Sequence, residues 1–140
     1  EYLNHQLEQF LSYNKKIQNR KTEFDWLCTS EDVVKKYCED PMAGFIFTWK
    51  GFKDLFTLVK RMQSKNIYVD ASDAPCLMTY GEEDPVTGYG AGAYKVYENL
   101  VKAGKTVTYK NYGHYRHEIQ NEPEVKNKYF KDIVDFINED

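Results

Sequence analysis

Hydrophobic residues in the first half of the chain recur at helical spacing. They return every three or four positions over residues 2–11, 29–40 and 50–65, which predicts three amphipathic helices separated by polar, irregular segments. The second of these has a defined start, because Thr29 or Ser30 can cap it and acidic residues follow in its first turn. The third places five apolar side chains on one face: Phe52, Leu55, Phe56, Val59 and Met62.

The second half of the chain alternates between strand and helix patterns. Residues 75–81 form a short apolar run ended by a glycine, and residues 106–113 are rich in β-branched and aromatic side chains, so both read as strands. Residues 92–105 have helical periodicity, and Pro123 precedes a last helical pattern that runs to residue 140. Strands joined by a helical crossover predict parallel pairing in an α/β sheet.

We therefore divide the chain into a helical region, residues 1–65, and an α/β region, residues 66–140. Two parallel strands alone do not make a sheet that is covered on both faces. The sequence also opens at Glu1 inside a helical pattern. We expect the chain to be the end of a larger fold whose first strands lie elsewhere.

Composition excludes several classes of protein. A net charge of −3 argues against a nucleic-acid binder, and the apolar stretches are too short to span a membrane. Cys28, Cys38 and Cys76 are an odd number at long spacings, which is typical of free thiols in a reducing, cytoplasmic compartment. Cys76 lies in an apolar run and is expected to be buried, and none of the three is expected to be a nucleophile or a zinc ligand.

The segment GEEDPVTGYGAG, residues 81–92, permits two interpretations. Gly88, Gly90 and Ala93 match the G-x-G-x-x-A spacing of a dinucleotide-binding loop, but the first glycine follows the strand too late and the next strand ends without an acid. The glycines are better explained as a tight turn into the following helix. We expect no nucleotide and no other cofactor.

Asp84 follows the first strand in the same segment, and His117 follows the second. The carboxyl ends of parallel strands meet at one edge of a sheet, about 4.8 Å apart, so the two side chains are predicted to come within hydrogen-bond reach. An aspartate on one imidazole nitrogen fixes the tautomer and stabilises the imidazolium when the other nitrogen takes a proton. Taken singly, Asp84 is better explained as a turn residue and His117 as a surface histidine. The joint order strand, Asp84, helix, strand, His117, helix is more specific and favours the pair.

His114 precedes His117 by three residues, and Glu118 follows it, which raises the question of a metal site. The metalloprotease helix needs the order H-E-x-x-H, and this segment has neither that order nor a helical pattern. No third ligand is well placed, so no metal site is expected.

The settings of Asp84 and His117 resemble those of the acid and base of an α/β-hydrolase, whose triad runs serine, acid, histidine along the chain. Residues 22–48 are similar to the cap of bacterial lysophospholipase-like and monoacylglycerol-lipase-like serine hydrolases, and residues 75–104 and 112–122 continue the likeness. The resemblance implies the C-terminal part of an α/β-hydrolase fold preceded by a helical cap, without the N-terminal half of the sheet.

The resemblance also assigns roles to individual residues. It implies that Asp84 orients the base, that His117 is the general base, and that Phe45 and Phe47 of the cap bind the acyl group of a small ester. G-x-S-x-G is absent from the sequence, whose serines are Ser12, Ser30, Ser64 and Ser72.

Without a nucleophile the chain by itself is expected to be inactive. Its expected partner is the missing half of the hydrolase or, through an exposed sheet edge, a second copy of the chain. An interaction module that keeps the fold without the chemistry is the alternative that the missing serine favours.

Overall fold

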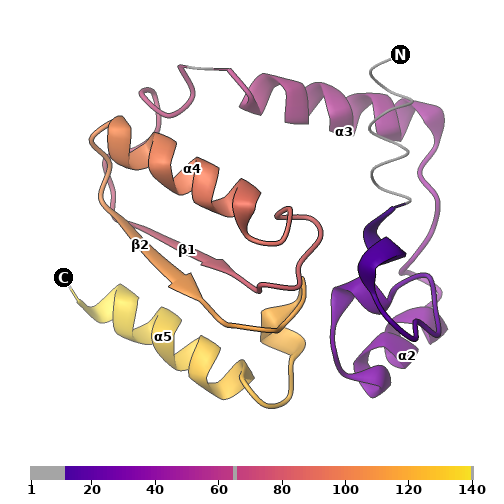
Figure 1. The fold of residues 1–140 in the computed structure, drawn as a ribbon. Coiled ribbons are helices and arrows are strands. Elements are labelled where there is room, and N and C mark those ends of the chain that lie inside the picture. Colours follow the sequence, from indigo (N-terminus) through magenta and orange to yellow (C-terminus); the bar gives the residue numbers. More distant parts are fainter. Residues whose placement is uncertain (1–11, 65, 140) are drawn as a thin grey trace.

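The computed structural model describes residues 12–64 and 66–139 of the chain (Figure 1). The predicted helix over residues 2–11 lies outside these ranges. The described elements, in chain order, are two 3-10 turns η1 (Tyr13–Lys16) and η2 (Asp25–Leu27), helices α2 (Glu31–Glu39) and α3 (Trp49–Met62), strand β1 (Cys76–Tyr80), helix α4 (Ala91–Lys102), strand β2 (Val107–Asn111), a 3-10 turn η3 (Ile119–Asn121) and helix α5 (Lys126–Asn138).

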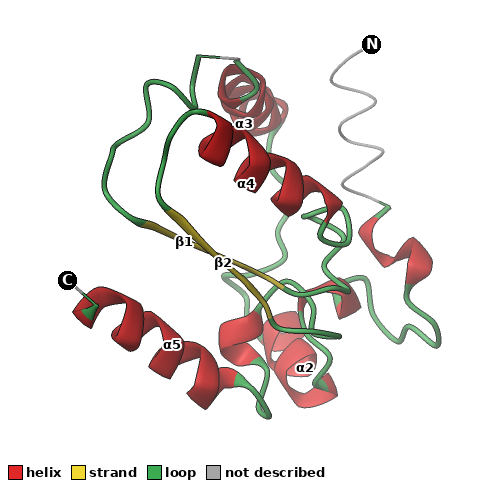
Figure 2. Ribbon diagram, turned by 60° about the vertical axis from the view of Figure 1, so that its left-hand side comes forward, coloured by secondary structure: helices red, strands yellow, loops and turns green. Residues whose placement is uncertain are grey.

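Strands β1 and β2 pair in parallel, with Cys76 opposite Val107 at the start and Tyr80 opposite Asn111 at the end. Helix α4 connects them, and Figures 1 and 2 both show α4 and α5 on opposite faces of the two strands. The predicted parallel α/β arrangement is therefore confirmed. In the described part of the chain the sheet has only these two strands.

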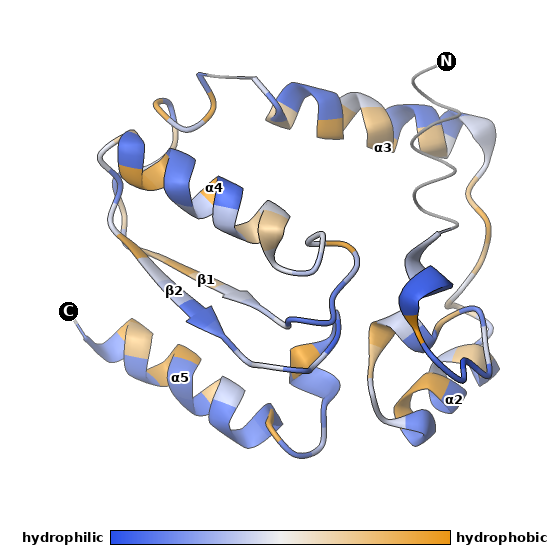
Figure 3. Cartoon of the chain, in the orientation of Figure 1, coloured by the Kyte–Doolittle hydropathy of each residue, from blue (hydrophilic) through white to orange (hydrophobic). Residues whose placement is uncertain are grey.

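The helical first half lies at the carboxyl ends of the strands. Figure 1 shows α2 and the turns η1 and η2 beyond those ends, and α3 on the side of α4. Figure 3 shows the hydrophobic residues of α3 on the side that faces the rest of the chain. Phe52 and Phe56 are buried there, as the periodicity predicts, whereas Met62 at the end of the same face is exposed. The division at residue 65 stays a prediction.

Two small clusters of buried residues replace a single core in the described part of the chain. The first joins Leu27, Cys28 and Val34 to the aromatic residues around α2, and the second joins Tyr112, Ile119 and Val125 beside α5. Under α4, the ring of Tyr109 stacks on Tyr80 of the neighbouring strand and on Tyr97 of α4. The strands themselves are only half-buried, which is unusual for a parallel sheet.

Three local predictions need correction. Ser30 occupies the N-cap of α2, but its side chain makes no capping hydrogen bond, and the Thr29 hydroxyl donates instead to Glu122. Cys76 is half-buried rather than buried. Helix α5 begins at Lys126, three residues after Pro123, because the carbonyl of Glu122 first closes a turn with the amides of the residues that follow.

The carboxylate of Glu122 connects two segments that lie far apart in the sequence. Glu122 is fully buried, with an exposed fraction of 0%. One oxygen accepts from the amides of Thr29, at 2.8 Å, and Arg116, at 3.3 Å, while the other accepts from the Thr29 hydroxyl. A buried carboxylate is stable only when its oxygens are satisfied in this way. Glu122 therefore fixes the start of α2 against the loop before α5.

We expect Glu122→Ala to lower the free energy of unfolding by about 3 kcal/mol, because it leaves a cavity in place of a fully buried side chain and removes the acceptor of the part-buried amides of Thr29 and Arg116. Glu122→Gln keeps one oxygen for those amides and should cost less. Urea unfolding of the purified variants measures both. Glu124→Ala removes an exposed carboxylate two residues away and is the control. Equal losses in Glu122→Ala and Glu124→Ala would contradict a special role for Glu122.

Candidate functional site

Asp84 lies in the loop that leaves β1, and it is almost completely buried, with an exposed fraction of 2%. Its Oδ1 accepts from the amide of Val86 at 2.8 Å, a local turn that the intervening Pro85 favours by fixing its own φ. Gly81 directly follows the strand, and a Cβ atom at this position would lie 2.0 Å from the carbonyl oxygen of Tyr115. The loops after β1 and β2 thus approach too closely for any other residue at position 81.

His117 lies in the loop after β2, and its Nδ1 is 3.2 Å from Oδ2 of Asp84. The predicted proximity of the two side chains is therefore confirmed. The His117 side chain is 39% exposed, and its other nitrogen, Nε2, makes no hydrogen bond with any of the residues that the structure describes. The imidazole is thus held at one nitrogen and available at the other.

The hydrogen bond to Asp84 raises the pKa of His117 above its ordinary value, against the opposing effect of burial. The charges of Asp84 and Glu118 act in the same direction. A histidine held in this way accepts a proton readily and keeps it as an imidazolium, which is what a general base must do in the middle of a reaction.

The glycine-containing loop between Asp84 and α4 satisfies its backbone amides by internal hydrogen bonds. The amides of residues 88–92 all donate within the loop, to oxygens of Asp84, Pro85, Thr87 and Gly88. Gly88 and Gly90 have positive φ angles of 63° and 84°, as the interpretation of a tight turn into a helix requires. Because those amides are already used, the loop does not offer the donors that a pyrophosphate needs.

Trp26 connects His117 to a large apolar hollow. The two rings lie 5.4 Å apart between centroids, and the indole also lines the hollow, whose volume is about 930 Å³. Phe45 and Phe47, the predicted acyl-binding residues, line the same hollow. The structure brings them to one cavity with Trp26, and their role in binding substrate stays a prediction. Most of the other lining residues are apolar, and they come from residues 13–52.

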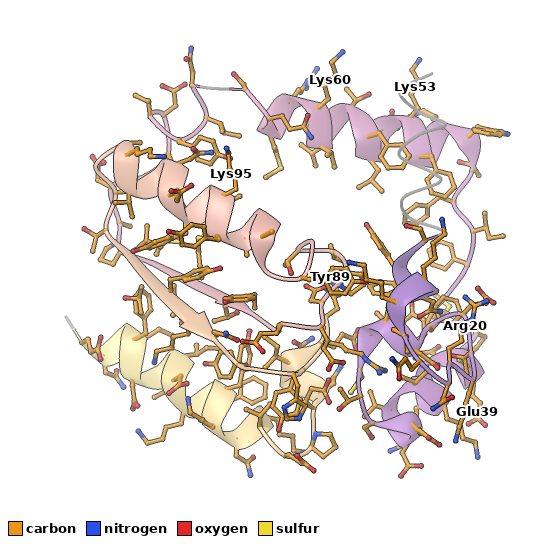
Figure 4. The ribbon with its side chains drawn as sticks, in the orientation of Figure 1. Arg20, Glu39, Lys53, Lys60, Tyr89 and Lys95 are labelled. Atoms are coloured by element: carbon orange, nitrogen blue, oxygen red, sulfur yellow. The ribbon has the colours of Figure 1, made fainter. Side chains whose placement is uncertain are left out.

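Tyr13 and Tyr89 lie close enough to Asp84 to feel the charge of its carboxylate. Burial, followed by the negative charge of Asp84, raises the pKa of both phenols. The ammonium group of Lys16 lies 4.1 Å from the centre of the Tyr89 ring, and Figure 4 shows Tyr89 between its own loop and the first described turn. Lysine over an aromatic face is a favourable contact that holds these two segments together.

The remaining candidates do not form a site. No group of three potential metal ligands is present among residues 12–64 and 66–139. The ring of His114 lies against Tyr115, 4.5 Å between centroids. Burial raises the pKa of the Cys28 thiol to about 12, so the thiol is protonated at neutral pH and a poor nucleophile. Within the same described residues, no helix is long and apolar enough to cross a membrane.

Three residues near His117 were not predicted from the sequence: Trp26, Arg116 and Glu122. Their partners lie about 90 positions away in the chain, and no local pattern encodes such contacts. Arg116 and Glu122 lie among other charged residues, in a segment that reads as an exposed loop. Trp26 ends a polar segment of the sequence, and only its large aromatic side chain could have indicated a buried contact.

We expect Asp84→Asn to lower the pKa of His117, because the hydrogen bond to the carboxylate is the largest cause of its rise. A pKa raised in the folded state stabilises the fold fully below the ordinary value of 6.5, and this contribution is lost as pH rises through the raised pKa. Titration of the histidine ring protons by NMR measures the change. Glu82→Gln, beside Asn111, is the control. An unchanged pKa in Asp84→Asn would show that the contact is absent in solution.

Comparisons with known proteins agree with the parallel α/β fold. The family model described as serine aminopeptidase, S33, matches residues 3–124. A carboxyl esterase from Bacillus coagulans, a highly thermostable enzyme solved in complex with glycerol, superposes with a TM-score of 0.84 at 28% identity, over 97% of this chain and 45% of that one. A lipase in an open form superposes with a TM-score of 0.78 at 25% identity, over 89% and 42% of the two chains.

The chain therefore spans less than half the length of either solved structure. A search of curated proteins gave no significant match. The family model covers most of the chain, and the two similar structures are ester hydrolases with the fold that the strands and helices predicted. The chain belongs to the serine aminopeptidase S33 family of α/β-hydrolases.

Proposed function

We propose that this chain carries the acid and the base of a serine hydrolase that acts on carboxylic esters. The observation that supports the proposal is the contact between His117 Nδ1 and the buried Asp84 carboxylate, at 3.2 Å. In a Ser-His-Asp triad the aspartate holds the tautomer in which Nε2 is free to take the proton of the serine. His117 is held in that manner, with Nε2 unbonded among the described residues.

The nucleophile in this proposal is a serine that lies outside the 140 residues. Its hydroxyl would lose its proton to His117 as its oxygen attacks the ester carbonyl. His117 would then give the proton to the departing alcohol, and water would repeat the two steps to release the acid. Asp84 would stay ionised throughout and stabilise the imidazolium.

The proposed substrate is a small acyl ester such as a monoacylglycerol or a lysophospholipid. The hollow beside Trp26 is lined mainly by apolar side chains, Phe45 and Phe47 among them, and about 930 Å³ is the size of a site for a molecule of that kind. The esterase with a similar fold was solved with glycerol bound. The proposal places the acyl group against Phe45 and Phe47.

The remainder of the sheet is the proposed partner. The chain exposes 10100 Å², whereas a compact monomer of 16.5 kDa exposes roughly 7,500 Å². The surplus has the size of one side of a large, obligate interface. Among the described residues, the two parallel strands are half-buried and pair only with each other. Further parallel strands would cover this surface.

An interaction module without chemistry remains the alternative, because no serine of the chain lies in a G-x-S-x-G turn. The two functions separate in one experiment on the protein at the length its gene encodes, with p-nitrophenyl butyrate as the ester and an aminoacyl p-nitroanilide as the peptide-like substrate.

We expect the complete protein to hydrolyse the ester. His117→Ala should lower turnover by about 10⁶-fold, since the members of a triad act as a unit, and Asp84→Asn by about 10⁴-fold. His114→Ala, which removes the neighbouring imidazole, is the matched control and should retain turnover. Full activity in His117→Ala would remove His117 from the mechanism. Cleavage of the anilide alone would replace the ester with a peptide substrate, and no cleavage of either would favour the module.

The 140-residue chain by itself should behave differently from the complete protein. We expect it to form dimers or larger species at tens of micromolar, because an unpaired strand edge pairs readily with another chain. Size-exclusion chromatography with light scattering measures the mass, with the complete protein as the control. A sharp monomer peak for the isolated chain would contradict the proposal that its sheet lacks neighbouring strands.

A further inference from the structure

The segment that carries Trp26 is fastened to the loop that carries His117 by hydrogen bonds on both sides of the histidine. The Arg116 guanidinium donates through one nitrogen to the carbonyl oxygens of Asp25, at 2.7 Å, and Cys28, at 3.0 Å. On the other side of the histidine, the amide of Glu118 donates to the carbonyl of Leu27 at 2.7 Å. Residues 25–28 thus have three carbonyls bound by the residues that flank His117.

Trp26 lies in the middle of this fastened segment. Its own amide donates to the side chain of the buried Asn14 at 2.9 Å, so the backbone is held on that side as well. Its indole then packs against the ring of His117, 5.4 Å between centroids and tilted by 46°. Contact with Asp84 fixes one nitrogen of the imidazole, but a single hydrogen bond leaves the ring free to swing about it. The indole limits that movement.

We infer that Arg116 is a positioning residue for the base: by holding residues 25–28 it keeps the Trp26 indole against His117, so that Nε2 points in one direction. The inference rests on the proposed function, in which His117 is the base. A base misplaced by about 1 Å can lower the rate on the order of 10²-fold. The Arg116 side chain is 18% exposed, and its Glu83 partner is 3.8 Å away, so its closest contacts are the two carbonyls.

The experiment compares Arg116→Met with Lys105→Met in the complete protein. Lys105 is a matched control, because it too is a mostly buried cation whose nitrogen donates to a backbone carbonyl, that of Ala71 at 2.6 Å, next to an exposed carboxylate. It lies before β2, at the opposite end of the strand from His117. Both variants should lose stability by similar amounts in a thermal melt.

We expect only Arg116→Met to lower kcat, by about 10²-fold with KM changed less than about threefold. The nuclear Overhauser contact between the Trp26 and His117 rings should disappear in that variant and persist in Lys105→Met. Arg116→Lys, which keeps a cationic donor, should recover much of both. Arg116→Met with the ring contact and kcat intact would overturn the inference, because Arg116 would then only stabilise the fold.

Trp26→Leu supplies a second measurement that does not depend on whether Arg116→Met folds. Losing the ring alone, with Arg116 present, should reproduce the fall in kcat, and an unchanged kcat would overturn the inference. The double variant should be no slower than either single one, whereas additive losses would show that the residues act separately. A wild-type protein that hydrolyses no ester would contradict the proposed function, while the ring contact would still test the role of Arg116.

Discussion

Parallel pairing of β1 with β2 is the constraint on which the candidate site depends. The register places Tyr80 opposite Asn111, so both strands end at the same edge and the next loop on each side begins at the same level. The amide of Glu82 then reaches the carbonyl of Gly113 at 2.6 Å, and Gly81 leaves just enough room for Tyr115. This close approach brings a buried carboxylate from one loop to an imidazole on the other. A shift of the register by one residue would separate them.

Residues 25–29 add a second restraint of a different kind. Strand pairing fixes where the loops begin, but His117 lies six residues beyond β2, where the backbone has no ladder to hold it. The contacts of Arg116, Glu118 and Glu122 with residues 25–29 supply that support. Because these bonds end mainly on backbone atoms of residues 25–29, they depend little on the side chains of that segment. The residues that line the hollow can therefore differ while His117 is held in the same place.

Sequence reasoning reached Asp84 and His117 because their signals are local. An apolar run followed by Asp-Pro, and a β-branched run followed by a histidine, are read within ten residues, and parallel topology then supplies the proximity. The prediction for Thr29 was wrong. A capping rule considers only neighbours in the sequence and assigned the Thr29 hydroxyl to α2, whereas the hydroxyl donates to the buried Glu122 more than 90 residues away. Arg116 was not predicted for the same reason, because the carbonyls to which it donates come within hydrogen-bond reach only through tertiary packing.

Under the proposed function, the arrangement of Asp84 and His117 leaves room for one further catalytic group. Both oxygens of the Asp84 carboxylate are used, by the Val86 amide and by His117, so the acid is already complete. His117 has Nε2 unbonded in the described residues, and its ring packs against Trp26, which lines the apolar hollow. What a triad would still need here is an attacking oxygen, and both half-buried strands end at the edge where Asp84 and His117 lie. A serine on a neighbouring parallel strand would meet His117 at the carboxyl edge, where α/β sheets keep their reactive groups. Under the proposed function, then, this chain holds the part of the machinery that orients and moves the proton, and the missing strands bring the atom that reacts.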